Sequence, residues 1–239
     1  MGSPTNEIGR GPNDETRHTV TFSKGFFMSQ FLVRQGDYLS LVNTNPAYFN
    51  TNHSFPMDLT RPIEQVAWSD ATNYCALLTA RERAAGRIFA TWTYRLPTES
   101  EWEFACRAGT TNVFYVGSTL TNGMANFDSR YSYVGGTGTV FDTNGVLLNH
   151  PVSVGSYPPN PKGLFDMAGN LWEWCSDWYT NYPASPVVDP QGPATGTQRV
   201  FRGGTFNSTG QQCRSAERNK VEPTSTLNTI GFRVVLGPP

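Results

Sequence analysis

Length, composition and charge limit the classes of protein to which this chain can belong. Its 239 residues suffice for one sizeable domain, and 23 Gly, 17 Pro and 13% aromatic residues favour a loop-rich globule with some β-structure over a helical bundle. The formal net charge is −1 and the Lys and Arg residues are scattered, which excludes nucleic acid and an anionic membrane as expected partners. No apolar run approaches the ~20 residues of a membrane span, and the polar first residues lack the apolar stretch of a secretory signal.

The first third of the chain contains short periodic segments. Residues 1–17 are polar, and we expect them to form a surface arm. Alternation over residues 18–22 and 26–33, around a Ser-Lys-Gly turn, predicts a β-hairpin. Residues 35–42 have the apolar spacing of a short helix, and residues 62–66 predict a short extended segment.

Two further helices have clear start signals. The first begins at Ser69 or Asp70, which are good N-cap residues. Its apolar stripe consists of Ala71, Tyr74, Cys75, Leu77 and Leu78. The second follows Thr98, which forms a capping box with Glu101, and should end by Gly109.

The remainder of the chain is mostly irregular. Residues 110–161 have almost no periodicity, and residues 179–197 form a Pro-rich connector. Residues 199–206 and 231–236 predict two strands that flank a polar excursion. Because there is no internal repeat and no interdomain linker, we expect a single domain over residues 1–239.

The stretch 161–178, PKGLFDMAGNLWEWCSDW, combines large apolar rings with acids and two glycines. Glycine lets backbone carbonyls approach a bound group closely, and buried acids need a cation or hydrogen-bond donors. We therefore predict a buried loop, not a plain helix or strand, that serves as the core of the domain and as a hard-metal site. Its polar members are Asp166, Asn170, Glu173 and Asp177.

Several motifs, in a fixed order, resemble one known family. They read MGSP, HTVTFSKGFFMSQFLV, RLPTESEWEFACRAGT, ANF, GLFDMAGNLWEWCSDWY, RVFRGGTF and IGFRVV. Over essentially its whole length the chain resembles the formylglycine-generating enzyme, or sulfatase-modifying factor, family. The resemblance implies an α+β class, namely that family's variant of the C-type-lectin-like fold. This variant has a small antiparallel sheet, two main helices and much irregular loop.

The resemblance also implies a calcium site in the stretch 161–178. Its ligands would be the side chains of Asp166 and Glu173 and the backbone carbonyls of Gly169 and Leu171. Calcium takes six to eight oxygen ligands and mixes carboxylates with carbonyls. In the alternative interpretation, Glu173 forms a cap or a salt bridge locally and Asp166 is exposed.

A second calcium site of the family would begin at Asn126 and the carbonyl of Phe127. The segment that should complete it differs here in length, and Asp142 or Asn144 could serve, so the second site is left open. A transition-metal site is not expected, because no two histidines have ligand spacing. The three histidines are His18, His53 and His150.

Members of this family that make formylglycine hold copper(I) with two cysteines. Counted from the Gly-Gly pair, the two positions here are Ser208 and Cys213, so only one thiol is present. Since copper(I) needs two thiolates for linear coordination, we predict no copper and no formylglycine generation by this route. Cys213 remains a weak catalytic candidate, because it could be a core thiol, a disulfide partner or a lone nucleophile beside Arg214. For all four cysteines we favour mostly buried thiols.

The polar segment before the last strand is the expected recognition surface. Loops on a rigid scaffold commonly carry binding residues, and related domains display variable residues in diversity-generating retroelements. We therefore favour a non-catalytic module that binds a protein or a small molecule, although a structural or immunity-type partner protein would look the same. The alternative is a diverged oxidoreductase, related to formylglycine-generating enzymes or iron-dependent sulfoxide synthases. The candidate ligand-binding residues are Thr205, Phe206, Asn207, Ser208, Thr209, Gln211, Gln212, Arg214, Glu217 and Asn219.

Overall fold

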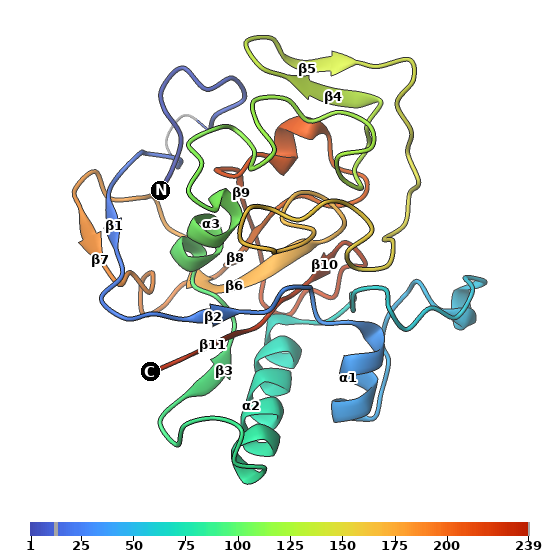
Figure 1. Cartoon of the computed structure of the whole chain (residues 1–239), viewed down its shortest axis with the longest axis vertical. Helices are drawn as coiled ribbons and strands as arrows, with labels where there is room; N and C mark the ends of the chain where they lie inside the picture. The colour runs from blue at the N-terminus through green and yellow to red at the C-terminus, as the bar shows by residue number, and fades with distance from the viewer. Residues whose placement is uncertain (12–13, 239) are drawn as a thin grey trace.

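Three α-helices form in the first half of the chain, as the periodicity predicts. The computed structural model describes residues 1–11 and 14–238 (Figure 1). The helices are α1 (Gln35–Val42), α2 (Trp68–Ala84) and α3 (Glu99–Arg107). Helix α2 begins slightly earlier than predicted, because Asp70 accepts the N–H of Ala67 (3.0 Å) from its position in the first turn.

A four-stranded sheet lies at the centre of the molecule (Figure 1). Its strand order is β10-β6-β8-β9, with β6 antiparallel to β8, β8 antiparallel to β9, and β10 parallel to β6. The strands are β6 (Trp172–Trp178), β8 (Arg199–Arg202), β9 (Arg218–Val221) and β10 (Ile230–Gly231).

The last seven residues of the predicted loop 161–178 are therefore a strand, and the prediction of an entirely irregular loop was wrong. The first four residues of β6 are all buried, so both faces of the strand are covered. A strand covered on both faces loses the apolar-polar alternation by which a half-exposed strand is recognised. The buried acid Glu173 is accommodated by an ion pair with Arg233, which lies between β10 and β11.

The predicted hairpin between residues 18–22 and 26–33 does not form. Strand β1 (Val20–Thr21) pairs in parallel with β7 (Val187–Val188). Strand β2 (Phe27–Met28) instead joins the sheet β2-β11-β3, which includes β3 (Thr93–Arg95) and β11 (Val235–Gly237). Long-range pairing with the C-terminal strand thus replaces the local turn.

One hairpin lies inside the predicted irregular region 110–161. Strands β4 (Tyr131–Val134) and β5 (Gly138–Phe141) pair antiparallel and lie at the opposite end of the molecule from α1 and α2 (Figure 1). Two short 3₁₀ helices also form, η1 (Thr51–His53) and η2 (Gly210–Cys213).

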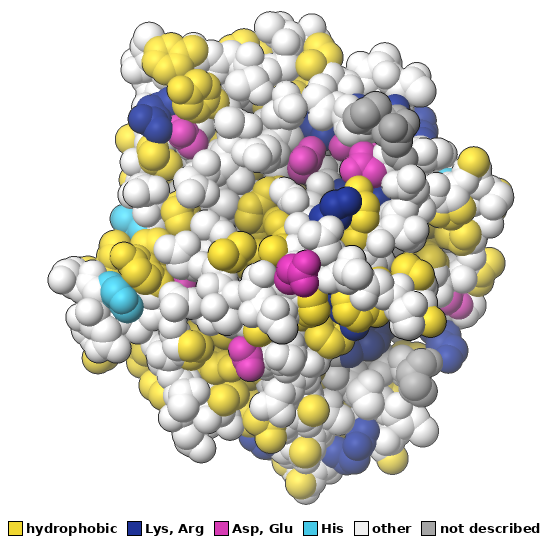
Figure 2. Space-filling model, turned by 180° about the vertical axis from the view of Figure 1, so that it is seen from behind, with side chains coloured by type: hydrophobic (Ala, Val, Ile, Leu, Met, Phe, Trp, Pro, Cys, Tyr) yellow, Lys and Arg dark blue, Asp and Glu magenta, His cyan; other side chains and the backbone are white. Residues whose placement is uncertain are grey.

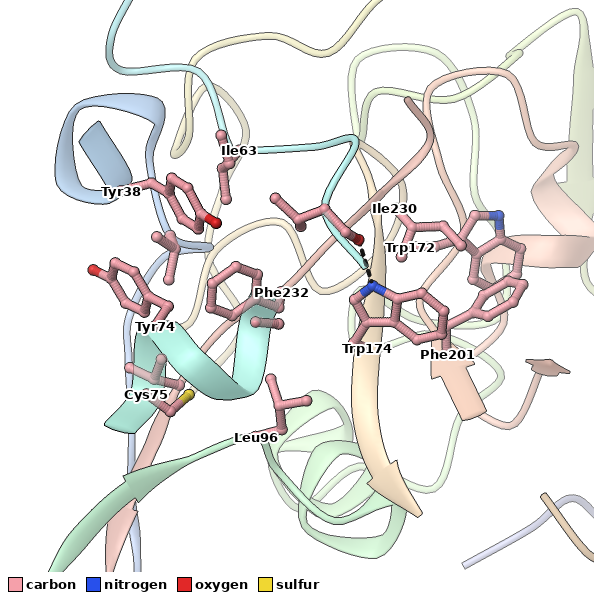
Figure 3. Packing of buried hydrophobic residues seen from close by; sticks show 14 of the residues in the cluster. Tyr38, Ile63, Tyr74, Cys75, Leu96, Trp172, Trp174, Phe201, Ile230 and Phe232 are labelled. Atoms are coloured by element: carbon pink, nitrogen blue, oxygen red, sulfur yellow. Dashed lines mark hydrogen bonds between the residues drawn. The ribbon is translucent and has the colours of Figure 1, made fainter. Parts of the chain in front are cut away.

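The core is built around the tryptophans of β6. Trp174 is fully buried and donates its indole N–H to the carbonyl of Val66 (3.1 Å; Figure 3). Phe232 packs edge-on against Tyr74, at 5.4 Å between ring centroids. All four cysteines are buried free thiols, which confirms that prediction. Within the described ranges, no helix is long and apolar enough to cross a membrane.

Candidate functional site

Glu173 forms a buried ion pair with Arg233, next to the expected calcium loop. The guanidinium Nε lies 2.6 Å from Oε2 and Nη2 lies 2.7 Å from Oε1, so both carboxylate oxygens have a donor. The indole N–H of Trp102 also donates to Oε2 (2.9 Å), and both members of the pair are fully buried. A cation on this carboxylate would displace or repel the guanidinium, so the Glu173 side chain does not fit the role of calcium ligand.

Asp166 has the opposite character, because its burial is not compensated by a bidentate partner. It is 3% exposed, and its Oδ2 accepts the N–H of Gly155 (2.9 Å). Burial is the main cause that raises the pKa of Asp166 to about 6. The alternative of an exposed Asp166 is therefore wrong. A buried carboxylate with this environment fits an oxygen-ligand site for a cation.

The backbone around Asp166 turns sharply. Asp166 (φ 59°), Gly169 (φ 74°) and Asn170 (φ 67°) all lie in the left-handed region. A side chain at Gly169 would clash with the carbonyl oxygen of Asn126, so only glycine allows this close approach. Leu171 is fully buried directly before β6.

The predicted second metal site lies against the first. Asn126 donates from Nδ2 to the carbonyl of His150 (3.0 Å) and to Oδ1 of Asn170 (3.2 Å), whereas its own Oδ1 is buried without a hydrogen-bond partner. That orphaned oxygen fits a donor or a cation. Phe127 is a core residue, 2% exposed.

The residues proposed to complete the second site occupy a turn after β5. There Asp142 accepts the N–H of Asn144 (2.9 Å). Across the described residues, no group of three or more His, Cys, Asp or Glu side chains is arranged to hold a metal ion. Any calcium site would therefore depend mainly on backbone and amide oxygens.

Cys213 closes the helix η2 and is 1% exposed. Burial raises the pKa of its thiol well above the ordinary value, which does not suit a nucleophile that must react as thiolate. At the other thiol position of the family, the hydroxyl of Ser208 accepts the N–H of Thr205 (3.1 Å) and stabilises a turn. Cys213 therefore has the environment of a core thiol.

Arg214 does not activate the thiol, because its guanidinium is committed elsewhere. It is fully buried and pairs with Glu15 (2.7 Å), Glu7 (2.6 Å) and Glu217 (2.6 Å). The prediction of Arg214 as a ligand-binding residue was wrong for this reason. The same contacts correct the expected surface arm, since Glu7 and Glu15 fix part of residues 1–17 to the domain; residues 12 and 13 of that arm lie outside the described residues.

Two more buried arginines hold the strands that carry the C-terminal segment. Arg202 of β8 pairs with Glu99 (3.1 Å) and Glu103 (2.7 Å) of α3. Arg218 of β9 makes a bidentate pair with Glu99 at 2.6 and 2.7 Å. Charge-assisted ion pairs are geometrically specific, so these contacts fix the position of β8 and β9 relative to α3.

Along the predicted recognition segment, buried and accessible residues are interleaved. Thr205, Phe206 and Ser208 are at most 3% exposed, so their assignment as ligand contacts was also wrong. They face inward because Phe206 packs on Phe49 (5.4 Å) and Thr205 donates to the carbonyl of Asn170 (3.1 Å).

The other predicted residues are accessible or partly accessible. Asn207 is exposed, and Thr209, Gln211, Gln212, Glu217 and Asn219 are half-buried. The exposed positions continue further along the chain than predicted, into a stretch where polar residues recur at every second position in the sequence. The exposed residues there are Lys220, Glu222, Thr224, Thr226 and Leu227. Glu217 is set apart because it pairs with the buried Arg214. We use the name C-terminal surface for the other accessible residues, which are Asn207, Thr209, Gln211, Gln212, Asn219, Lys220, Glu222, Thr224, Thr226 and Leu227.

Aromatic groups accompany the C-terminal surface. Lys220 lies over the ring of Tyr179, with Nζ 3.8 Å from its centroid. Gln211 approaches Thr139 of β5 (3.4 Å), on the hairpin that exposes Tyr131 and Phe141. Figure 2 shows the back of the molecule, where dark blue and magenta side chains stand among white and yellow ones. The C-terminal surface is mostly uncharged and polar, with one lysine and one glutamate and with aromatic neighbours. Such a composition suits a specific contact surface more than an electrostatic one.

Comparisons with known proteins cover nearly the whole chain. The family described as Sulfatase-modifying factor enzyme 1-like domain matches residues 1–237. The formylglycine-generating enzyme of Streptomyces coelicolor is 39% identical over 206 residues, which are 80% of this chain and 59% of that protein. The formylglycine-generating enzyme of Bos taurus is 34% identical over 178 residues, which are 72% of this chain and 43% of that protein. The chain thus spans about half the length of these relatives.

Two solved structures are similar over the full chain. Treponema denticola variable protein 1 has a TM-score of 0.76 at 26% identity, and the match covers 100% of this chain and 91% of that one. PvdO from Pseudomonas aeruginosa has a TM-score of 0.75 at 27% identity and covers 100% of this chain and 90% of that one.

Proposed function

Because the chain belongs to the family of sulfatase-modifying factor enzyme 1-like domains, we propose that it is a non-catalytic, calcium-stabilised member that binds a protein or small-molecule ligand through its C-terminal surface. The predicted α+β variant of the C-type-lectin-like fold is confirmed by the full-length structural matches. Fold alone does not assign an activity, so the proposal depends on the residues.

The interleaving of buried and exposed residues is the observation that carries the proposal. Buried ion pairs of Arg202, Arg214 and Arg218 fix the backbone of the segment. Side chains between and after these arginines, such as Asn207 and Glu222, are exposed and polar and have no part in the core. Binding residues are commonly displayed in this way, on loops held by a rigid scaffold.

The structural similarity to Treponema denticola variable protein 1, which is described as a variable protein, supports a binding role. We propose that this chain, like a variable protein, tolerates sequence change at the exposed positions of one segment. Diversification by a retroelement is the corresponding genetic proposal. A second copy of the coding segment with adenine-directed differences, near a reverse transcriptase gene, would support it.

The non-catalytic part of the proposal depends on the single thiol. With Ser208 in a turn and Cys213 protonated in the core, two thiolates for copper(I) are not available in this segment. Anaerobic copper(I) titration of the monomer should therefore show no tight bis-thiolate binding. Tight binding with one copper per chain, together with oxidation of a cysteine peptide, would favour the diverged oxidoreductase instead.

Calcium would be held by the Asp166 carboxylate and the carbonyls of Gly169 and Leu171. A second ion near Asn126 and Phe127 remains a further proposal, supported by the orphaned amide oxygen. Bound calcium would neutralise the buried charge of Asp166 and crosslink the turns that precede β6.

Paired libraries test the binding surface. One library randomises five members of the C-terminal surface, and the control library randomises five buried residues of the same segment. The randomised surface residues are Asn207, Gln212, Lys220, Glu222 and Thr224, and the buried controls are Thr205, Phe206, Ser208, Ser215 and Ala216. Both are displayed on phage and selected against immobilised lysozyme as a probe.

We expect binders from the surface library alone, and each binder should lose its affinity when the original residues are restored. Protease resistance measured on unselected clones reports folding separately. If the surface library folds but yields no binder, or if its clones unfold as often as the buried controls do, the proposed display role is wrong.

A further inference from the structure

A second candidate site lies between residues 22–28 and helix α3. The segment leading to β2 passes beside α3 (Figure 1). Residues of both line a cavity of about 610 Å³. That volume is within the range of small-molecule sites. None of its lining residues belongs to the C-terminal surface, and neither metal loop contributes an expected ligand.

Three phenylalanine rings form the wall of this cavity. Phe22 lies 5.3 Å from Phe104 and 5.7 Å from Phe26, in edge-to-face contacts. Phe104 is 49% exposed, although its neighbours in α3, Glu103 and Ala105, are buried. Apolar surface of this extent costs free energy in water in proportion to its area, and an occupant that covered it would recover that free energy.

The charged side chains that line this cavity are positive. The lining includes Lys24 and Lys162, and among the described residues that form it there is no acid. The ammonium of Lys162 lies 5.3 Å from the ring centroid of Phe104, so the charge stands at the edge of the apolar wall. Hydrogen bonds from Ser23, together with the charge of Lys24, lower the pKa of Asp189. Because Lys24 already interacts with this carboxylate, Lys162 is the better positioned of the two lysines for an anion.

An adjoining cavity of about 500 Å³ shares Phe22, Lys24 and Gly25 with the first. It contains two acids, and both are already engaged. Glu101 binds Arg95 (2.6 Å), and Asp189 accepts the N–H of Ser23 (2.8 Å). The shared wall lets an elongated apolar body extend beyond the first cavity.

We propose that this cavity binds an amphipathic anion, that is, a small molecule with one carboxylate and an aromatic or aliphatic body. The body lies against Phe22, Phe26 and Phe104, and the carboxylate pairs with Lys162. This activity is independent of the C-terminal surface.

The test uses 8-anilinonaphthalene-1-sulfonate, an aromatic anion whose fluorescence rises in apolar sites, in a titration of the folded chain. Decanoate and 1-decanol are then compared as competitors of equal chain length. We expect saturable binding of one probe per chain and displacement by decanoate at a lower concentration than by 1-decanol. If 1-decanol displaced the probe as readily as decanoate does, the charge of the carboxylate would have no role in binding, and the proposal of an anion site would be wrong.

Four variants locate the site. Lys162→Gln should weaken decanoate about 3- to 5-fold, the range of an exposed ion pair, whereas Lys162→Arg should keep its affinity. Phe104→Ser should weaken the probe and both competitors, and Phe89→Ser, at an exposed ring elsewhere, should change none of them. Melting temperatures equal to wild type show that the variants are folded. Unchanged affinity in Lys162→Gln and Phe104→Ser, or an equal loss in Phe89→Ser, would overturn the proposal.

Discussion

Arg233 and Glu173 illustrate how single residues determine this structure. The pair connects the end of the chain with β6 and has no exposure to solvent. A glutamate between two tryptophans looks in sequence like a metal ligand, and only the fold shows that an arginine 60 residues later satisfies it. Sequence reasoning could not locate this partner, because the pairing depends on tertiary packing.

Arg233→Met should destabilise the protein by about 3–5 kcal/mol, since it leaves the Glu173 charge buried without its partner. The double variant Glu173→Gln with Arg233→Met should recover a large part of that loss. Urea unfolding at pH 7 measures both. Equal losses in the single and double variants would mean that the charge pair is not the cause.

Glu64 provides a pH-dependent test at the same scale. It is fully buried, its Oε1 accepts the N–H of Phe49 (2.9 Å), and its Oε2 has no partner. Burial raises its pKa from 4.5 to about 7. Between these values the unfolded chain loses the proton first, so the contribution of Glu64 to stability falls as the pH rises from 4.5 to 7 and stays low above it.

Glu64→Gln removes this titration. The variant should match wild type near pH 4 and be more stable at pH 8, by up to about 3 kcal/mol for a shift of this size. Urea unfolding across pH 4–8 shows the difference, with Asp177→Asn as a comparison at a separate buried acid whose pKa is also raised to about 7. A difference between Glu64→Gln and wild type that does not change with pH would contradict this assignment.

At the scale of elements, local sequence signals correctly predicted the helices, which are stabilised by local contacts. The three helices form where periodicity and caps indicate, because their hydrogen bonds join residues close in sequence. The strands were harder, since β2 pairs with β11 and β1 with β7 across most of the chain. The β4–β5 hairpin was missed, because turn-forming residues are frequent before and after its short strands and hide their alternation.

The capping box of α3 is a local signal that can be measured. Thr98 accepts the N–H of Glu101 (3.2 Å), and Glu101 accepts the N–H of Thr98 (2.8 Å). Thr98→Ala should therefore cost about 1 kcal/mol of unfolding free energy. Ser69→Ala is the control, because the N-terminus of α2 is capped through Asp70 and not Ser69. A loss in the control as large as in Thr98→Ala would contradict the difference between the two caps.

At the scale of the whole molecule, the proposed calcium adds a ligand-dependent term to stability. A ligand that binds only the folded chain stabilises it according to its concentration and affinity. The protein should therefore unfold at a lower temperature in roughly 1 mM EGTA, which removes free calcium, than in a buffer that contains calcium. Asp166→Asn should reduce this difference, and an identical melting curve with and without EGTA would contradict calcium binding.

Only part of the proposed recognition site could be predicted from the sequence. The polar segment was predicted to lie between two late strands, but the strand β9 within it was missed. Its exposed residues extend to Leu227. The buried roles of Arg214 and Ser208 were not foreseeable, because they depend on Glu15 and on a turn at Thr205. Polar character alone does not distinguish a displayed side chain from one that holds the scaffold.

A positional scan of residues 202–229 tests this division most directly. Each residue is replaced in turn by all others, and the folded fraction is measured by protease resistance. Members of the C-terminal surface should accept most replacements, whereas the buried positions, Arg202, Thr205, Ser208, Arg214 and Arg218, should accept few. Equal tolerance at the two kinds of position, or loss of folding at the exposed ones, would contradict a displayed binding surface on a fixed frame.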